Sequence, residues 1–142
     1  MKKTSLIAVA LLVTTIALAQ KIQTKEVPAA VKTAFQKNYP QIKILKWDKE
    51  DGNFEASYEL NEIDNSVLFD QQGNIIESEV EIKTTQLPQG VLEYVKTNYK
   101  TLKVDEAAKI THNDGVIVYE VEMKKMDLLF DSNGKFIKEI KN

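Results

Sequence analysis

The chain has 142 residues, 19 basic against 21 acidic side chains, a formal charge of −2, one histidine and no cysteine. All its basic residues are lysine, which excludes the bidentate arginine contacts with carboxylate, phosphate or guanine, and we predict no nucleic-acid partner. Without cysteine and with a single histidine, the sequence offers no disulfide, thiolate nucleophile or multi-histidine metal site, so we expect no metal and no cofactor.

The first nineteen residues have the pattern of a secretory signal peptide. Two lysines precede an apolar run over residues 6–18, and small residues stand three and one positions before the bond between Ala19 and Gln20. An uncleaved anchor is the alternative, but this run is shorter than the ~20 residues that span a bilayer. We therefore predict cleavage after Ala19 and a periplasmic or secreted protein without stable membrane insertion.

Residues 20–142 read as one pattern written twice, as repeats over 20–83 and 84–142 that form one compact body. Identical residues recur at an offset of 60 in the first part of each repeat and of 61 in the second part. The recurring residues include Pro28 and Pro88, Asn38-Tyr39 and Asn98-Tyr99, Tyr58-Glu59 and Tyr119-Glu120, Leu68-Phe69-Asp70 and Leu129-Phe130-Asp131, and Gly73 and Gly134.

Each repeat is predicted to begin with a helix, from near Pro28 to Tyr39 and from near Pro88 to Tyr99. Apolar residues recur there at three- and four-residue steps, as in Val31, Phe35 and Tyr39, which is typical of a helix with one buried face. Four short strands follow each helix. We expect them at about 42–49, 53–61, 66–70 and 74–82, and at about 102–110, 116–123, 127–131 and 135–141.

Turn residues separate these strands. Asp51-Gly52 and Asp114-Gly115 predict hairpins that use the positive φ of glycine. Asp70 and Asp131, each three residues before a glycine, predict turns in which the aspartate accepts amide hydrogen bonds. The sequence thus predicts an α+β fold: a tandem repeat of a helix plus a four-stranded antiparallel meander, with the helices packed on one face of the sheet.

This layout resembles the PepSY-like, beta-lactamase-inhibitor-like family of small secreted bacterial proteins. The resemblance covers nearly all of residues 20–142. It implies tandem repeats, helices on one face of an antiparallel sheet, and a concave sheet face that grips a protein partner. The chain departs from the true inhibitor because it has no disulfides and no loop that matches an inhibitory one, so inhibition of a beta-lactamase is not carried over. The matching segments are Val27-Pro28 to Tyr39-Pro40, Tyr58-Glu59-Leu60, Phe69-Asp70 with Gly73, Leu87-Pro88 to Tyr99, Tyr119-Glu120-Val121, and Phe130-Asp131 with Gly134.

The sequence contains little that supports a catalytic or metal-binding site. The turn that begins at Asp131 lacks the further oxygen ligands of a calcium loop. His112 is close to Asp114 in sequence, but we interpret it as a solvated turn histidine rather than a general base. We predict that the protein is not an enzyme. Carboxylates at two-residue steps are interpreted as the polar face of a half-exposed sheet, although a loose cation site remains open; they are Glu55, Glu59, Glu77, Glu79, Glu81, Glu120 and Glu122.

The strand pattern also places apolar residues away from the helices. We expect Ile42, Ile44, Tyr58, Val67, Phe69, Leu102, Val104, Tyr119, Leu128 and Phe130 to face the helices. The opposite face would then receive the candidate partner-binding residues Leu45, Trp47, Leu68, Val116, Val118, Leu129 and Phe136. Packing between the two sheets, or a bulge that reverses the register, is the alternative.

The sequence therefore predicts a non-enzymatic binding module that grips an unidentified protein or peptide, in an inhibitor-like manner, through an exposed sheet face. Trp47 would be the anchor. The alternative is an envelope protein that binds a small ligand or a cation through its acidic strand faces.

Overall fold

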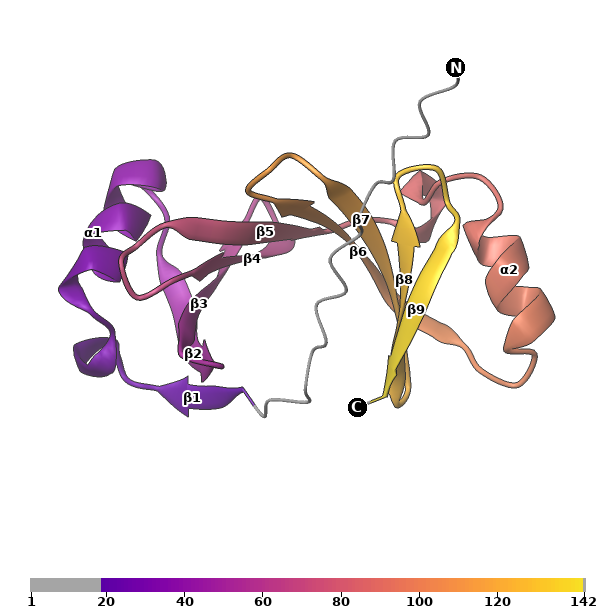
Figure 1. Ribbon diagram of the computed structural model, residues 1–142, viewed down its shortest axis with the longest axis horizontal. Coiled ribbons are helices and arrows are strands. Elements are labelled where there is room, and N and C mark those ends of the chain that lie inside the picture. Colours follow the sequence, from indigo (N-terminus) through magenta and orange to yellow (C-terminus); the bar gives the residue numbers. More distant parts are fainter. Residues whose placement is uncertain (1–18, 142) are drawn as a thin grey trace, which may run out of the picture.

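The strands of the protein follow one another in chain order across a single sheet (Figure 1). The computed structural model describes residues 19–141; the predicted signal peptide, apart from Ala19, lies outside the described residues. All nine strands are antiparallel to their neighbours and lie in the order β1 to β9. The strands are β1 (Gln20–Ile22), β2 (Ile44–Glu50), β3 (Asn53–Leu60), β4 (Ile63–Phe69), β5 (Ile75–Glu81), β6 (Val104–His112), β7 (Ile117–Met123), β8 (Met126–Asp131) and β9 (Phe136–Lys141).

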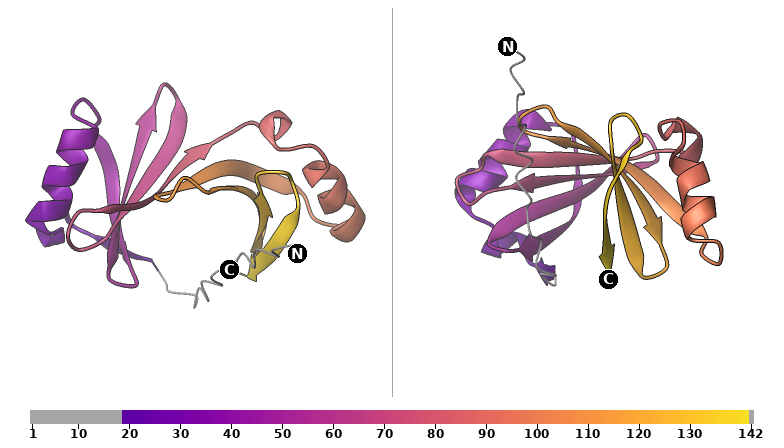
Figure 2. Two further views of the ribbon diagram at one scale, coloured as in Figure 1. Left: turned by 45° about the horizontal axis from the view of Figure 1, so that its top comes forward. Right: turned by 45° about the vertical axis from the view of Figure 1, so that its right-hand side comes forward.

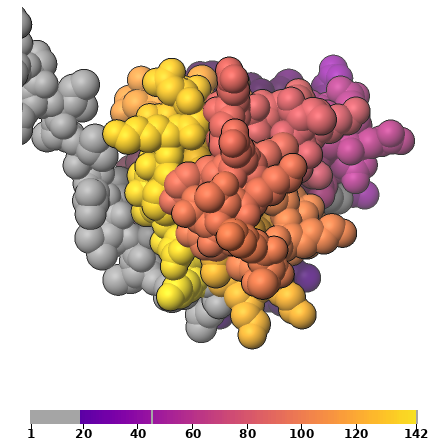
Figure 3. Space-filling model, turned by 90° about the vertical axis from the view of Figure 1, so that its right-hand side faces the viewer, coloured from indigo at the N-terminus to yellow at the C-terminus, as the bar shows by residue number. Residues whose placement is uncertain are grey.

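Within residues 19–141, two α-helices interrupt this meander, α1 (Ala29–Asn38) before β2 and α2 (Val91–Asn98) before β6. A 3-10 turn precedes each, η1 (Thr24–Glu26) and η2 (Thr84–Gln86). Both helices lie on the outer side of the curved sheet, one at each end of the molecule (Figure 2). In Figure 3, α2 covers the end of the molecule with β9 beside it. The predicted α+β fold with helices on one face is confirmed, whereas the tandem duplication remains a prediction that this arrangement fits.

The predicted helices and eight of the strands are found close to their expected positions, and two differences have local causes. β1 was not predicted, because its three residues show no apolar alternation; it is held by pairing with β2, with Ile22 opposite Trp47. The second helix begins at Val91 rather than near Pro88, because Gly90 has a φ of 89°, a left-handed conformation that cannot belong to a right-handed helix.

Phe35 of α1 is the centre of the first hydrophobic core. Its ring lies 5.9 Å from Trp47, 5.8 Å from Tyr58 and 6.4 Å from Phe69, measured between centroids, in edge-to-face arrangements. Such aromatic pairs contribute about 0.5–1.5 kcal/mol each beyond the burial of their area. Apart from Val27, the buried side chains of this cluster come from α1, β2, β3 and β4, so the first helix is fastened to these three strands.

A second core lies beneath α2. Val91 and Val95 of the helix pack with Leu128 and Phe130 of β8 in a cluster separate from the first. The predicted helix-facing residues lie in or against one of these two cores with one exception, because Leu102 is 38% exposed. That residue precedes β6, where the chain has not yet joined the sheet.

The two aspartate turns have the predicted geometry and also touch the helices. Oδ1 of Asp70 accepts hydrogen bonds from the backbone N–H of Gln72 and Asn74, both at 2.9 Å, and Gly73 has a φ of 85°. A Cβ at Gly73 would lie 2.7 Å from the carbonyl oxygen of Ala30 in α1. The turn between β4 and β5 therefore requires glycine both for its φ and for its close approach to the helix.

We predict that Gly73→Ala destabilises the fold more than Gly115→Ala. Gly115 has nearly the same φ, 84°, but no atom lies within 4 Å of a Cβ added there. Gly115→Ala should cost only the left-handed penalty of about 1–2 kcal/mol, and Gly73→Ala should cost about 1–3 kcal/mol more because the backbone of α1 must move. Urea unfolding of both variants measures the difference, and equal losses would show that the turn does not need its contact with α1.

Candidate functional site, an acidic groove on the inner sheet face

The inner face of the sheet, opposite the helices, forms a groove of about 590 Å³. The sheet is curved, and α1 and α2 lie on its outer side (Figure 2). Most of its charged lining is acidic, so the groove favours cations and excludes anions. The acids in the lining are Glu55, Asp64, Glu79, Glu81, Glu106, Glu120 and Glu122, and the lysines are Lys21 and Lys46.

Strand alternation explains why the acids share this face. In β3 the buried Phe54, Ala56 and Tyr58 face α1, so the intervening Glu55 and Glu59 point to the inner face. Cross-strand pairing carries this side of the sheet through β4 and β5 to β6 and β7. Its paired positions are Glu55–Leu68–Glu77–His112, Ser57–Ser66–Glu79–Ile110, Glu59–Asp64, Glu81–Ala108–Glu120–Leu129 and Glu106–Glu122–Asp127.

The sequence prediction that the strand carboxylates form one polar face is thus met by the register, which brings all seven to the inner side. Glu106 and Lys46 were not among the predicted site residues. Each stands next to an irregularity in strand pairing, between Val104 and Glu106 or between Ile44 and Lys46. Two-residue spacing alone could not assign these residues to a face.

Burial changes the acidity of the groove floor. Together with the charge of the neighbouring carboxylates, it raises the pKa of Glu79 to about 7 and that of Glu120 to about 8. Burial and the charge of Glu55 also raise the pKa of Glu77, although the nearby His112 opposes them. A buried carboxyl group loses the hydration that favours its charged form. The floor of the groove therefore changes its charge near neutral pH.

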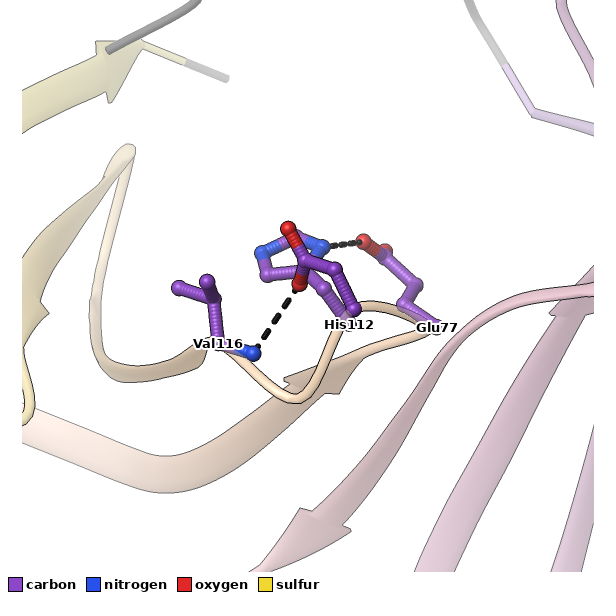
Figure 4. A network of polar contacts seen from close by, with 4 residues as sticks. Glu77, His112 and Val116 are labelled. Carbon is purple, nitrogen blue, oxygen red and sulfur yellow. Dashed lines mark hydrogen bonds and ion pairs between the residues drawn. The ribbon is translucent and has the colours of Figure 1, made fainter. Parts of the chain in front are cut away.

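His112 is the last residue of β6 rather than a turn residue. Its Nδ1 lies 3.1 Å from Oε2 of Glu77 on the neighbouring strand, an ion pair when the imidazole is protonated (Figure 4). Asp114 does not serve the histidine: its Oδ1 accepts the backbone N–H of Val116 at 3.0 Å. The arrangement is a cross-strand contact at the side of the groove and not the beginning of a nucleophilic triad.

The prediction that Trp47 anchors a partner on the inner face is wrong about its position. Trp47 is 2% exposed and lies in the first core against Phe35. The β2–β3 register shifts between Ile44 and Lys46, so Leu45 is an extra residue and the faces of the following residues are exchanged. The alternative of a bulge is the one that the structure contains.

Phe136 is likewise on the helix side. It pairs directly with Phe130 across β8 and β9, and its ring stacks on Tyr94 of α2 with centroids 4.9 Å apart. A register shift between Leu129 and Phe130 accompanies this pairing. As in β2, an irregularity in the ladder decides which face receives the aromatic ring.

The other candidate residues are divided between the inner face and its surroundings. Leu68, Val118 and Leu129 are on the inner face, each opposite an inner-face residue of a neighbouring strand. Val116 is 52% exposed before the start of β7. Partner binding through these four residues stays a prediction.

Within residues 19–141, no three histidine, aspartate or glutamate side chains are grouped so that they could hold a metal ion. Neither α1 nor α2 has the length and apolar composition of a membrane-spanning helix. The groove thus has dispersed carboxylates rather than a preformed ligand shell.

Comparison with known proteins gives a consistent picture of the fold. The family model described as "Putative beta-lactamase-inhibitor-like, PepSY-like" matches residues 14–77 and again residues 64–138. Two overlapping matches to one model are consistent with the predicted duplication. No curated protein matches the chain.

Solved structures with a similar fold come from Bacteroides. A DUF2874 family protein from Bacteroides uniformis has 21% identity and a TM-score of 0.70, with 80% of this chain and 88% of that chain covered. A BLIP-like protein from Bacteroides fragilis has 26% identity and a TM-score of 0.58, with 80% and 86% covered. A protein from Bacteroides eggerthii described as a "putative periplasmic" one has 15% identity and a TM-score of 0.71, with 81% and 88% covered.

The position of Trp47 predicts its fluorescence. An indole with 2% exposure should emit at short wavelength and resist quenching by iodide, and unfolding in urea should abolish both properties. Because the chain contains one tryptophan, all of the indole fluorescence comes from Trp47. Strong iodide quenching of the folded protein would show that Trp47 is exposed and would contradict the bulge in β2.

The raised pKa values of Glu79 and Glu120 predict that the fold loses stability as pH rises. In the unfolded chain both groups titrate near 4.3–4.5, so between about pH 5 and 8 the folded chain binds more protons and the free energy of unfolding falls. Each group contributes at most about 1.4 kcal/mol per pH unit. Urea titrations from pH 5 to 9 measure the slope, which Glu120→Gln should reduce and Glu59→Gln, at an exposed position on the same face, should leave unchanged.

Proposed function

The chain belongs to the beta-lactamase-inhibitor-like, PepSY-like family, and we propose that it is a non-enzymatic module that binds a protein or peptide in its acidic groove. The observation that carries this proposal is the concentration of seven carboxylates and two lysines in one groove on the inner sheet face. Neither the family nor the similar structures named above indicate an enzymatic class.

The chemistry of the groove selects the partner. Lysine or arginine side chains would find several carboxylates within the same groove, and charge complementarity of this kind speeds association and fixes orientation. Leu68 and Leu129 lie among these acids on the inner face and add apolar contact area. The partner that fits best is therefore a segment or surface with basic side chains and some apolar ones.

We place the protein in the bacterial envelope, in the periplasm or outside the cell. The predicted signal peptide over residues 1–19 supports this location, as does the description of the similar Bacteroides eggerthii structure as that of a periplasmic protein. In that environment, a chain without disulfides depends on its two cores and on continuous strand pairing to hold the sheet together.

The alternative proposal, a module for a small cationic ligand or a cation, rests on the same carboxylates. Carboxylates are the ligands that calcium prefers, but the residues that the structure describes contain no preformed group of three. A calcium titration followed by thermal unfolding separates the alternatives: a saturable rise in melting temperature with calcium, without affinity for basic peptides, would favour the cation.

Charge reversal in the groove tests the main proposal. We expect the protein to bind a fluorescent octalysine peptide with an affinity that falls as salt rises, because screening weakens exposed charge pairs. Glu122→Lys should weaken binding about tenfold or more, since it removes one attraction and adds one repulsion to an exposed position in the groove.

Glu93→Lys is the matched control, because this exposed residue lies on α2 outside the groove and the net charge of both variants is the same. Equal affinities of the two variants would mean that the peptide responds to net charge rather than to the groove. The same pair of variants, used as bait on an envelope extract, distinguishes proteins retained by the groove from those retained by general charge.

A further inference from the structure

The stretch where β5 pairs with β6 joins two halves that are otherwise held separately. The first core is built on α1 and β2 to β4, with Ile22 of β1 and Ile75 of β5 packed against it, and the second is built on α2, β7 and β8, with Val104 of β6 and Phe136 of β9 packed against it. Neither contains a residue of the paired stretch 77–81 or 108–112. On the outer face Val80, opposite Lys109, remains 37% exposed. Neither α1 nor α2 packs over this junction, so its bend has little apolar packing behind it.

The inner face of the same junction carries Glu79 and Glu120. Glu79 lies opposite Ile110 and Glu120 opposite Ala108, both on β6. Because β5 and β7 are separated by one strand, the two glutamate strands are about 10 Å apart. Ala108 and Ile110 are each 8% exposed, so the floor between the two carboxyl groups is apolar.

Neither carboxyl group has a hydrogen bond or an ion pair within the part of the chain that the structure describes. Of the two lysines in the groove, Lys46 is engaged by Asp48 at 3.0 Å. The titratable and charged groups on the same face as the two glutamates are Lys21 from β1, Lys46, Asp48 and Glu50 from β2, Glu55 and Glu59 from β3, Asp64 from β4, Glu77 and Glu81 from β5, Glu106 and His112 from β6, Glu122 from β7, Asp127 and Asp131 from β8, and Lys138 from β9.

In this setting, the protonated carboxyl groups are compatible with the bend and the ionised ones are not. Both side chains are half-buried, and a carboxylate with reduced hydration among like charges is disfavoured, which is also why the pKa of Glu79 rises to about 7 and that of Glu120 to about 8. Flattening the sheet would increase the hydration of both groups and separate them from the acids on the opposite wall. Little packing on the outer face opposes such a movement.

We propose that protonation of Glu79 and Glu120 sets the bend of the sheet at the β5–β6–β7 junction, so that the groove widens when the two groups ionise. The device acts in the free protein and does not depend on the proposed partner. It makes the shape of the groove, as well as its charge, a function of pH in the range in which histidine switches also act.

Spin labels on the two edges of the sheet measure the bend directly. Lys25, beside β1, and Lys141, in β9, are exposed, and the absence of native cysteine makes Lys25→Cys and Lys141→Cys the only labelling sites. Pulsed electron paramagnetic resonance measures the distance between the two labels. We expect the distribution of this distance to shift to longer values between pH 5.5 and 9, with the midpoint of the shift between pH 7 and 8. In Glu79→Gln with Glu120→Gln, the distribution should keep its pH 5.5 form throughout.

Glu59→Gln with Glu81→Gln is the matched control. Both positions are exposed and on the inner face, so this variant should keep the shift of the parent. A distribution independent of pH in the parent, or an unaltered shift in the Glu79 and Glu120 variant, would overturn the proposal. Carbon-13 titration of the glutamate carboxyl groups supplies a second test, because midpoints near 4.5 for Glu79 and Glu120 would also overturn it.

Discussion

The alternation of side chains between the two faces of one continuous sheet decides what every strand contributes. From β1 to β7 each strand has residues that lie in or against a core beneath a helix or residues that line the groove, and the strands that do both alternate between the two faces. Because the strands are consecutive and antiparallel, the face on which a residue lies is set by the pairing register with the preceding strand. The position of a carboxylate in β7 therefore depends on registers that begin at β2, and one extra residue anywhere changes the face of all that follow in that strand.

Four irregularities in the ladder show how strongly this constraint acts. They occur between Ile44 and Lys46, Leu68 and Phe69, Val104 and Glu106, and Leu129 and Phe130. The first moves Trp47 into the core, where its indole packs on Phe35 at a centroid distance of 5.9 Å. Without that shift the ring would lie on the inner face among the acids, and the first core would lose the contact between Trp47 and Phe35.

These irregularities mark what the sequence could and could not predict. The helices, the turns at Asp70 and Asp131 and eight strands follow from local chemistry, such as helical spacing, aspartate acceptors and glycine with positive φ. The face of Trp47 does not, because Ile44, Leu45 and Trp47 are all apolar and satisfy either register. The groove was visible as carboxylates two residues apart, but only cross-strand pairing shows that acids from β3, β5 and β7 share one surface.

The groove also works against the stability of the fold that supports it. Natural sheets commonly bury apolar residues at their centre, but here the central strands carry Glu79 and Glu120 beside Ala108 and Ile110. A half-buried carboxyl group loses hydration, which no ion pair within residues 19–141 replaces for these two glutamates, so folding alone gives no reason for this placement. Charged or strained positions of this kind mark functional surfaces. Glu79 and Glu120 lie at the junction where neither helix supplies packing. At this junction the two carboxyl groups influence both the charge of the groove and the bend that forms it.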